Sequence, residues 1–240
     1  MGKRIRCYLV FASPFYRVVM FLLVPVLLVG SMLWLRNAVG DKGIAGNLGP
    51  ALLMMALLSF AEIFSDTWLF GGIQAKDTIN TDYLKTSGEG MGILRKALPL
   101  DFLRKFLSAA GISAVYYLAV LYGDGDFAGG FAWGERTAVL PGAYAPAGGG
   151  LWWAGVLFFP AAVSWFFSVL GTFLTRFADT FWANMMVGNG AVILVSLSWR
   201  FPGVWKYIWG YDILFLLLGF IGSVAAVKAA MKKVEGSYYD

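Results

Sequence analysis

The sequence predicts an all-α, polytopic membrane protein with six transmembrane helices, and three observations support this fold class. Apolar residues make up 59% of the 240-residue chain and charged residues only 14%. Soluble chains have about 45–50% apolar and about 25% charged residues. The mean hydropathy is +0.70. The apolar residues also gather in runs, and a helix needs about 20 such residues to cross the hydrocarbon core of a bilayer. Lipid is therefore the expected solvent for most of the surface.

Six apolar runs are the predicted spans. They cover residues 16–35, 50–70, 106–122, 151–173, 183–199 and 211–231. The third and fifth runs are short, and without them the chain has four spans with both termini still on one side. No loop between the runs is long enough for a soluble domain, so residues 1–240 are treated as a single transmembrane domain. The loop at 123–150, which is rich in glycine, is placed on the outer side.

The distribution of basic residues predicts the orientation. With the amino terminus inside, the inner segments hold 14 of the 19 lysines and arginines, and the outer loops hold 5. Inner loops of membrane proteins carry this excess, so both termini are expected in the cytoplasm. The net charge of +5 then reflects topology and not nucleic-acid binding, because the basic residues form no patch interleaved with aromatic residues.

Several kinds of chemistry are excluded by residue counts and motifs. The chain contains no histidine and one cysteine, which excludes histidine-based triads and most zinc sites. It also lacks the G-x-x-x-x-G-K-[ST] pattern of a phosphate-binding loop. We therefore expect no catalytic residue, bound cofactor or metal in this chain. If ATP drives its activity, a separate polypeptide binds the ATP and Mg.

The inner segment between the second and third spans predicts a short amphipathic helix. Residues 86–89, Thr-Ser-Gly-Glu, fit a capping box, and Pro99 is expected to end the helix near Leu98. Asp101 is expected to cap a following helix that leads into the third span. Such a helix either docks into a groove of a partner protein or lies on the membrane surface. Its apolar stripe and the basic residues of its last turn are Met91, Leu94 and Leu98, and Arg95 and Lys96.

Ionisable and amide side chains inside the spans are the other candidate site residues. Glu62 and Asp66 lie four residues apart in the second span, hence on one helix face, and Asn184 and Asn189 belong to the fifth span. Such residues are costly in hydrocarbon and usually face the bundle interior or water. They are predicted either to line a translocation path, for a proton or a cation in the case of the two carboxylates, or to hydrogen-bond between helices. Arg176, in the short inner loop after the fourth span, is a second candidate for partner contact.

One stretch resembles a known family. Residues 82–101, DYLKTSGEGMGILRKALPLD, together with the basic start and six spans, resemble the coupling-helix region of type-2 ABC exporter permeases. The most similar group is the small Gram-positive permeases that export phenol-soluble modulins and antimicrobial peptides. The resemblance covers the architecture of nearly the whole chain, but its specific motif covers these 20 residues.

The resemblance implies a function and partners. The chain is expected to be the permease subunit of an exporter for amphipathic, cytotoxic peptides or related toxic compounds, in a bacterial plasma membrane. Two copies would join two ABC ATPase subunits, which bind ATP and Mg. The alternative is an ion-coupled secondary transporter that uses Glu62 and Asp66. The residues that would contact the ATPase are Ser87, Glu89, Met91, Leu94, Arg95, Leu98 and Arg176.

Overall fold

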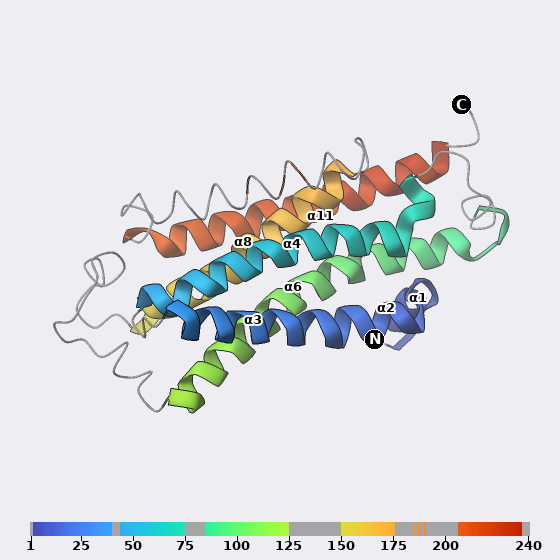
Figure 1. Cartoon of the computed structure of the whole chain (residues 1–240). Helices are drawn as coiled ribbons and strands as arrows, with labels where there is room; N and C mark the ends of the chain where they lie inside the picture. The colour runs from blue at the N-terminus through green and yellow to red at the C-terminus, as the bar shows by residue number, and fades with distance from the viewer. Residues whose placement is uncertain are drawn as a thin grey trace.

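The fold is an elongated bundle of helices (Figure 1). The computed structural model describes residues 2–39, 44–74, 85–124, 150–175, 185, 187, 190 and 206–236. Helices account for the regular structure of these residues, so the predicted all-α class is confirmed. The elements are α1 (Gly2–Phe11), α2 (Pro14–Val18), the π-helical turn η1 (Val19–Leu23), α3 (Val24–Val39), α4 (Ile44–Gln74), α6 (Gly90–Asp124), α8 (Gly150–Leu174) and α11 (Ile208–Gly236).

Four helical stretches are long and apolar enough to cross a membrane. They are Pro14–Val39, which joins α2, η1 and α3, and Asn47–Phe70, Ala154–Leu174 and Ile208–Gly236. These match the first, second, fourth and sixth predicted runs, so the chain is an α-helical membrane protein. The third predicted run, 106–122, is helical within α6 but is not one of the four. Of the fifth run, 183–199, only residues 185, 187 and 190 are described.

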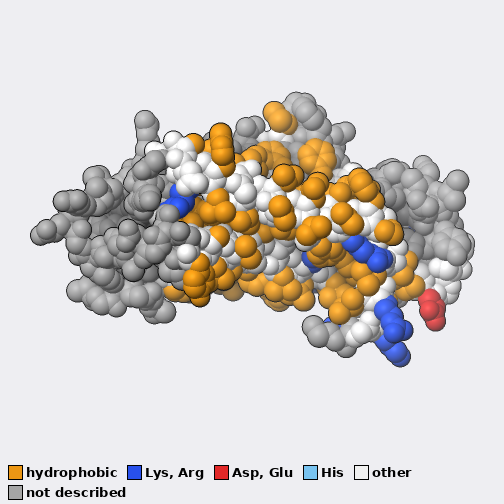
Figure 2. Space-filling model, turned by 60° about the horizontal axis from the view of Figure 1, so that its bottom comes forward, with side chains coloured by type: hydrophobic (Ala, Val, Ile, Leu, Met, Phe, Trp, Pro, Cys, Tyr) orange, Lys and Arg blue, Asp and Glu red, His pale blue; other side chains and the backbone are white. Residues whose placement is uncertain are grey.

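The outer surface of the bundle carries large apolar side chains. Trp34 is 68% exposed and Phe220 is 63% exposed, and both lie on helices that can span a membrane. Figure 2 shows apolar side chains across the middle of one face, with lysine and arginine side chains toward its ends. Soluble monomers rarely expose contiguous apolar surface of this extent. Lipid tails are the solvent that such a surface requires.

One end of the bundle brings together α1, the end of α4, the start of α6 and the end of α11; we name it the basic end. Its apolar core includes Tyr8, Phe70, Leu94 and Met231, one from each of these helices. At the opposite end, the described basic residues are Arg36 and Lys206. The described basic residues of the basic end, including those a few turns into its helices, are Lys3, Arg4, Arg6, Arg17, Lys85, Arg95, Lys96, Arg104, Lys105, Lys228, Lys232 and Lys233.

Helix α6 does not end where the sequence predicted. It begins at Gly90 and continues for 35 residues through Pro99 to Asp124, so the expected stop at Leu98 is wrong. The proline removes one helical hydrogen bond, at a cost of about 3 kcal/mol. Pro99 itself is exposed, whereas Leu98 and Phe102 on either side are buried, and this packing holds the helix continuous. Asp101 therefore lies inside a helix and caps none.

A glycine on α11 allows this helix to approach α8 closely. A Cβ atom at Gly219 would lie 2.7 and 2.8 Å from two ring carbons of Trp165. The Trp165 ring is held in place because its Nε1–H donates a hydrogen bond to the Phe102 carbonyl, at 3.3 Å. A larger residue at this position must therefore separate the two helices.

We expect the Gly219→Ala variant to lose about 1–3 kcal/mol of unfolding free energy, as overpacked cores do. Gly210→Ala, on the same helix, is the control, because a Cβ at Gly210 meets no atom within 4 Å. That change is expected to raise stability by about 0.4–1 kcal/mol, through the lower entropy of the unfolded chain. Denaturation of both purified variants in detergent micelles measures the difference. Equal stability of the two variants would contradict the close approach.

Candidate functional site

Five charged side chains meet inside the bundle, near the basic end. Each of them is at most 8% exposed, although ionisable groups in membrane proteins are rarely removed from water without a partner. We name this group the buried ion cluster. Its members are Glu62 and Asp66 of α4 and Asp101, Arg104 and Lys105 of α6.

The helical repeat explains why these five residues lie on one face of α4 and one face of α6. Glu62 and Asp66 are four residues apart, so both project from one side of α4. Asp101, Arg104 and Lys105 are spaced by three and four residues, so they project together from one side of α6. The two sides face each other, and carboxylates of one helix therefore meet cations of the next.

Arg104 is the central cation of the cluster. Its Nη1 donates a hydrogen bond of 3.0 Å to Oε1 of Glu62, and its Nη2 donates to Oε2 of the same carboxylate. Its Nε donates to Oδ1 of Asp101 at 3.1 Å, and Nη2 also contacts Oγ of Ser65 at 3.2 Å. Two parallel bonds from a planar guanidinium to one carboxylate form the strongest type of protein ion pair. This contact fixes the rotation of α6 relative to α4.

Lys105 extends the cluster to a third helix. Its Nζ lies 3.1 Å from Oδ2 of Asp101 and 3.9 Å from Oδ1 of Asp66. The same ammonium group donates a hydrogen bond of 2.7 Å to Oγ1 of Thr172 on α8. Side chains of α4, α6 and α8 therefore contact a single buried cation.

Two tyrosines connect the cluster to the amino-terminal helices. The hydroxyl of Tyr8, on α1, donates a hydrogen bond of 3.2 Å to Oδ1 of Asp101 and lies 3.3 Å from the hydroxyl of Tyr16, on α2. The guanidinium carbon of Arg104 is 5.9 Å from the ring centroid of Tyr16, within the range of a cation–π contact. Movement of α1 away from α6 would thus remove a hydrogen bond from the cluster.

The charges in the cluster determine its protonation. Burial alone would raise the pKa of Asp101, but the positive charges of Lys105 and Arg104 hold it below its ordinary value, so this carboxyl is ionised. Burial and the neighbouring Asp101 charge raise the pKa of Tyr8 far above its ordinary value. Tyr8 therefore keeps its proton and acts as the donor.

The cluster contains both of the predicted carboxylates and residues that the sequence analysis did not link to them. Glu62 and Asp66 lie on one helix face in the bundle interior, as expected, and an ion-conducting role for them stays a prediction. Asn184, Asn189 and Arg176 lie outside the described residues. The cluster members not selected as site residues in advance are Asp101, Arg104 and Lys105, and neither were their contacts Tyr8, Tyr16 and Thr172. The available signal was a carboxylate followed by two cations at 101–105, together with the two carboxylates of the preceding span.

The predicted partner-contacting helix is only partly available at the surface. Leu94 is 0% exposed and Leu98 is 1% exposed, because α1 and α11 of the same chain cover them. These two leucines are thus covered by their own chain, and docking of this stripe into another protein stays a prediction. Ser87 and Met91 are half-buried. Between Ser87 and Pro99, the exposed residues are Gly88, Glu89, Gly92, Arg95, Lys96 and Pro99.

A further buried carboxylate lies in α11. Asp212 is 0% exposed, and neither carboxylate oxygen has a hydrogen-bond partner in the part of the chain that the structure describes. Its helical neighbours Ile208 and Phe215 belong to an apolar core that α4 and α8 share. This carboxylate is therefore a destabilising group in the observed packing.

We expect Asp212→Val to raise the free energy of unfolding by about 1–3 kcal/mol, the desolvation cost of an unsatisfied polar group. Asp212→Asn keeps a polar group of the same shape and should bring little of this gain. Thermal unfolding in detergent compares the two variants with the unmodified chain. A loss of stability in the valine variant would show that the carboxylate has a stabilising partner.

Comparison with known proteins gives no assignment of function, so a function can be argued only from the structure. The chain matches no family model, no curated protein and no solved structure. What the buried ion cluster can do chemically is hold helices α1, α4, α6 and α8 together through ion pairs and hydrogen bonds in a medium of low dielectric constant, and release them together when those contacts separate.

Proposed function

We propose that this chain is the membrane-spanning permease subunit of an ATP-driven exporter of the type-2 ABC class. In this proposal two copies assemble with two ATPase subunits, which bind ATP and Mg. The observation that carries the proposal is the continuity of α6. This single helix joins an exposed, charged start at the basic end to the buried ion cluster and to the third predicted span.

The exposed side of the α6 start supports contact with an ATPase. The side chain of Arg95 is 73% exposed and lies 4.0 Å from Glu235 of α11, whose side chain is 57% exposed. Glu89, just before the helix, and Lys96, next to Arg95, are exposed as well, while Leu94 packs into the core. Surface ion pairs such as Arg95–Glu235 contribute little to stability and can be exchanged for a partner's charges.

The helix then transmits movement of the partner into the membrane. Arg95 and Arg104 are separated by nine residues, roughly 14 Å along a helix that rises about 1.5 Å per residue. Because the helix is continuous, a push at Arg95 displaces the buried ion cluster as part of a rigid body. Displacement of Arg104 and Lys105 changes their contacts with α4 and α8 at once.

Six spans with both termini in the cytoplasm are part of the proposal. The basic end gathers α1, the start of α6 and the end of α11, and it carries most of the described lysines and arginines. Loops and helix ends with this excess face the cytoplasm. In this proposed orientation the exposed start of α6 is on the cytoplasmic side, where a partner ATPase is also located.

Amphipathic, cytotoxic peptides or related toxic compounds are the proposed cargo. A groove of about 620 Å³ runs between α6, α8 and α11 and is lined by Phe102, Phe106, Trp165 and Phe220, with Lys228 at its border. Aromatic walls beside a cation suit a cargo with an apolar face and an acidic or carboxy-terminal group. The groove flanks α6 directly, so movement of this helix changes its shape.

Charge reversal at the exposed face tests the proposal. In the double variant Arg95→Glu/Lys96→Glu, a P-loop ATPase encoded by a neighbouring gene is expected to co-purify at least about tenfold less, a difference of about 1.4 kcal/mol or more in binding. Peptide-stimulated ATP hydrolysis in nanodiscs should fall in parallel. Lys232→Glu, an exposed change on α11 at the same end, is the control. Undiminished co-purification and stimulation in the double variant would exclude this docking face.

A secondary transporter is the second candidate, and the burial of Glu62 and Asp66 on one face of α4 favours it. Buried carboxylates in membrane helices are the groups that proton- and cation-coupled transport commonly uses. In that case the chain alone, in proteoliposomes, transports solute along a proton or cation gradient without any ATPase. Glu62→Gln and Asp66→Asn should then abolish the dependence on the gradient. Transport that requires an added ATPase would exclude this candidate.

A further inference from the structure

An open groove lies on the side of α6 that faces α1 and α3. Its volume is about 750 Å³, and α1, η1, α3 and α6 supply its walls. Val26, Leu107 and Val115 are examples of wall residues that are more than half exposed, so the groove opens on the outer surface of the bundle. That surface faces lipid in a membrane, and lipid therefore has direct lateral access to the groove.

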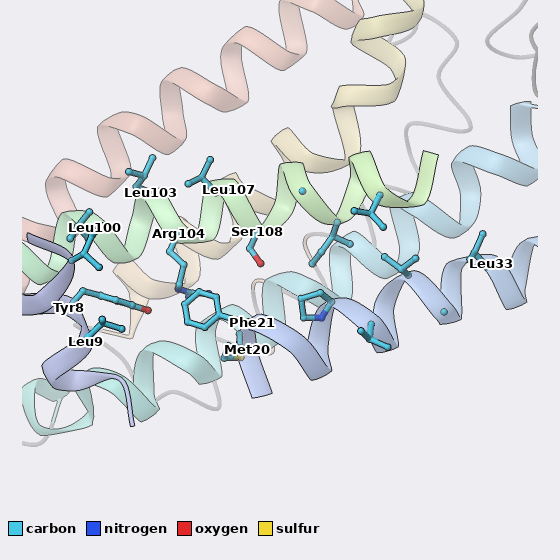
Figure 3. A pocket seen from close by; sticks show the side chains of 18 residues that line it. Tyr8, Leu9, Met20, Phe21, Leu33, Leu100, Leu103, Arg104, Leu107 and Ser108 are labelled. Carbon is cyan, nitrogen blue, oxygen red and sulfur yellow. The ribbon is translucent and has the colours of Figure 1, made fainter. Parts of the chain in front are cut away.

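The length of the groove suits one hydrocarbon chain. On α6 its wall extends from Leu100 to Val115, which spans roughly 22 Å at about 1.5 Å per residue. One leaflet contributes about 15 Å, half of a hydrocarbon core about 30 Å thick. Figure 3 shows the groove running along α6 and α3, with Leu100 and Leu33 toward opposite ends of the view. The groove is therefore long enough to hold an acyl chain over the full thickness of one leaflet's hydrocarbon region.

The polar side chains of the groove lie toward the basic end. Among the residues that line it, Tyr8, Arg104 and Ser108 are polar, and Arg104 extends from α6 toward the side where Tyr8 and Phe21 lie (Figure 3). Ile5 of α1 also lines the groove at this end. Its sequence neighbours Arg4 and Arg6, and Lys3 before them, are exposed. Each such lysine or arginine near a membrane surface attracts anionic lipid by about 1 kcal/mol.

We propose that this groove binds one acyl chain of an anionic phospholipid, taken from the leaflet at the basic end, with the headgroup against Lys3, Arg4 and Arg6 of α1. The apolar walls recognise the chain, and the exposed cations recognise the negative headgroup. The bound lipid contacts α1, α3 and α6 together and so stabilises the position of α1 beside the buried ion cluster. This proposal needs only the membrane location of the chain and is independent of the exporter assignment.

Two glycines allow the groove to be filled without disturbing the helices. Gly111 of α6 and Gly30 of α3 both line it, and a Cβ atom at either position meets no atom within 4 Å. The phenylalanine variants Gly111→Phe and Gly30→Phe therefore place a ring in the space of the acyl chain from opposite walls. Gly210→Phe is the matched control, because its Cβ also meets no atom within 4 Å and it lies outside the groove.

The experiment measures binding of dioleoyl phosphatidylglycerol to the purified full chain by native mass spectrometry, with dioleoyl phosphatidylcholine as the neutral comparison. We expect the anionic lipid to bind more tightly and each groove-filling variant to weaken it by roughly tenfold or more, since every methylene displaced from an apolar site weakens binding severalfold. Gly210→Phe should bind as the unmodified chain does. The triple variant Lys3→Gln/Arg4→Gln/Arg6→Gln should bind both lipids equally.

Two results would overturn the proposal. One is unchanged binding of phosphatidylglycerol in both Gly111→Phe and Gly30→Phe, with helix content by circular dichroism equal to that of the control. The other is a loss of dimers in these variants without a loss of lipid, which would make the groove an interface between two copies. Gly111→Ala adds only one methyl group to open space and should keep both the fold and the bound lipid.

Discussion

Replacement of Arg104 with methionine is expected to lower the free energy of unfolding by about 3–5 kcal/mol, the usual cost of removing one partner from a buried ion pair. The change leaves the Glu62 and Asp101 carboxylates buried without their guanidinium partner. Arg95→Met is the control, because the Arg95–Glu235 pair is exposed and 4.0 Å long. Exposed pairs of this kind contribute about 0–1 kcal/mol. Equilibrium unfolding in mixed micelles gives both values.

A double variant separates the ion pair from other effects of the substitution. In Arg104→Met/Glu62→Gln the unpaired Glu62 charge is removed, so part of the lost stability should return. The two substitutions are in contact, and such neighbours commonly show coupling of about 0.5–3 kcal/mol. Strict additivity would show that the pair with Glu62 is not the source of the stabilisation by Arg104.

The second large effect is expected at Leu94. Leu94→Ala should lower the free energy of unfolding by about 2–5 kcal/mol, the range for truncation of a buried leucine. The side chain is 0% exposed and packs in the core of the basic end, with residues of α1 and α11. Lys96→Ala, two residues away and exposed, should change stability by no more than about 0.5 kcal/mol.

The same pair of variants separates folding from partner contact. Leu94→Ala should retain binding of an ATPase wherever the variant stays folded, because its exposed neighbours Arg95 and Lys96 are unchanged. Lys96→Ala should weaken that binding without a loss of stability. Thermal unfolding and co-purification of the same preparations test both statements. If Leu94→Ala kept full stability and lost its partner, the leucine would be a contact residue after all.

The apolar helices were predictable because their signal is local. Runs of apolar residues near the length of a bilayer core specify a helix whatever it packs against, and four predicted spans coincide with helices of that character. The end of the amphipathic helix was not predictable in the same way. Pro99 weakens α6 locally, but burial of Leu98 and Phe102 outweighs this loss, and that burial depends on α1, α8 and α11.

The site was predictable only in part for a similar reason. Ionisable residues within an apolar run stand out in the sequence, so Glu62 and Asp66 were found. Arg104 and Lys105 precede the third run and were interpreted as inner-side charges, the role that most lysines and arginines near spans have. Their true partners depend on the rotation and depth at which α6 packs against α4. Spacing along one helix does not specify either quantity.

The contacts of Lys105 have a consequence for biogenesis. A charged side chain that enters the hydrocarbon region without a partner is costly. The carboxylates of α4 precede α6 in the chain, so the acceptors are already synthesised when Arg104 and Lys105 leave the ribosome. Thr172 of α8 follows later and completes the coordination of the ammonium group. The amino-to-carboxyl order of translation thus supplies each cation of the cluster after carboxylates that can pair with it already exist.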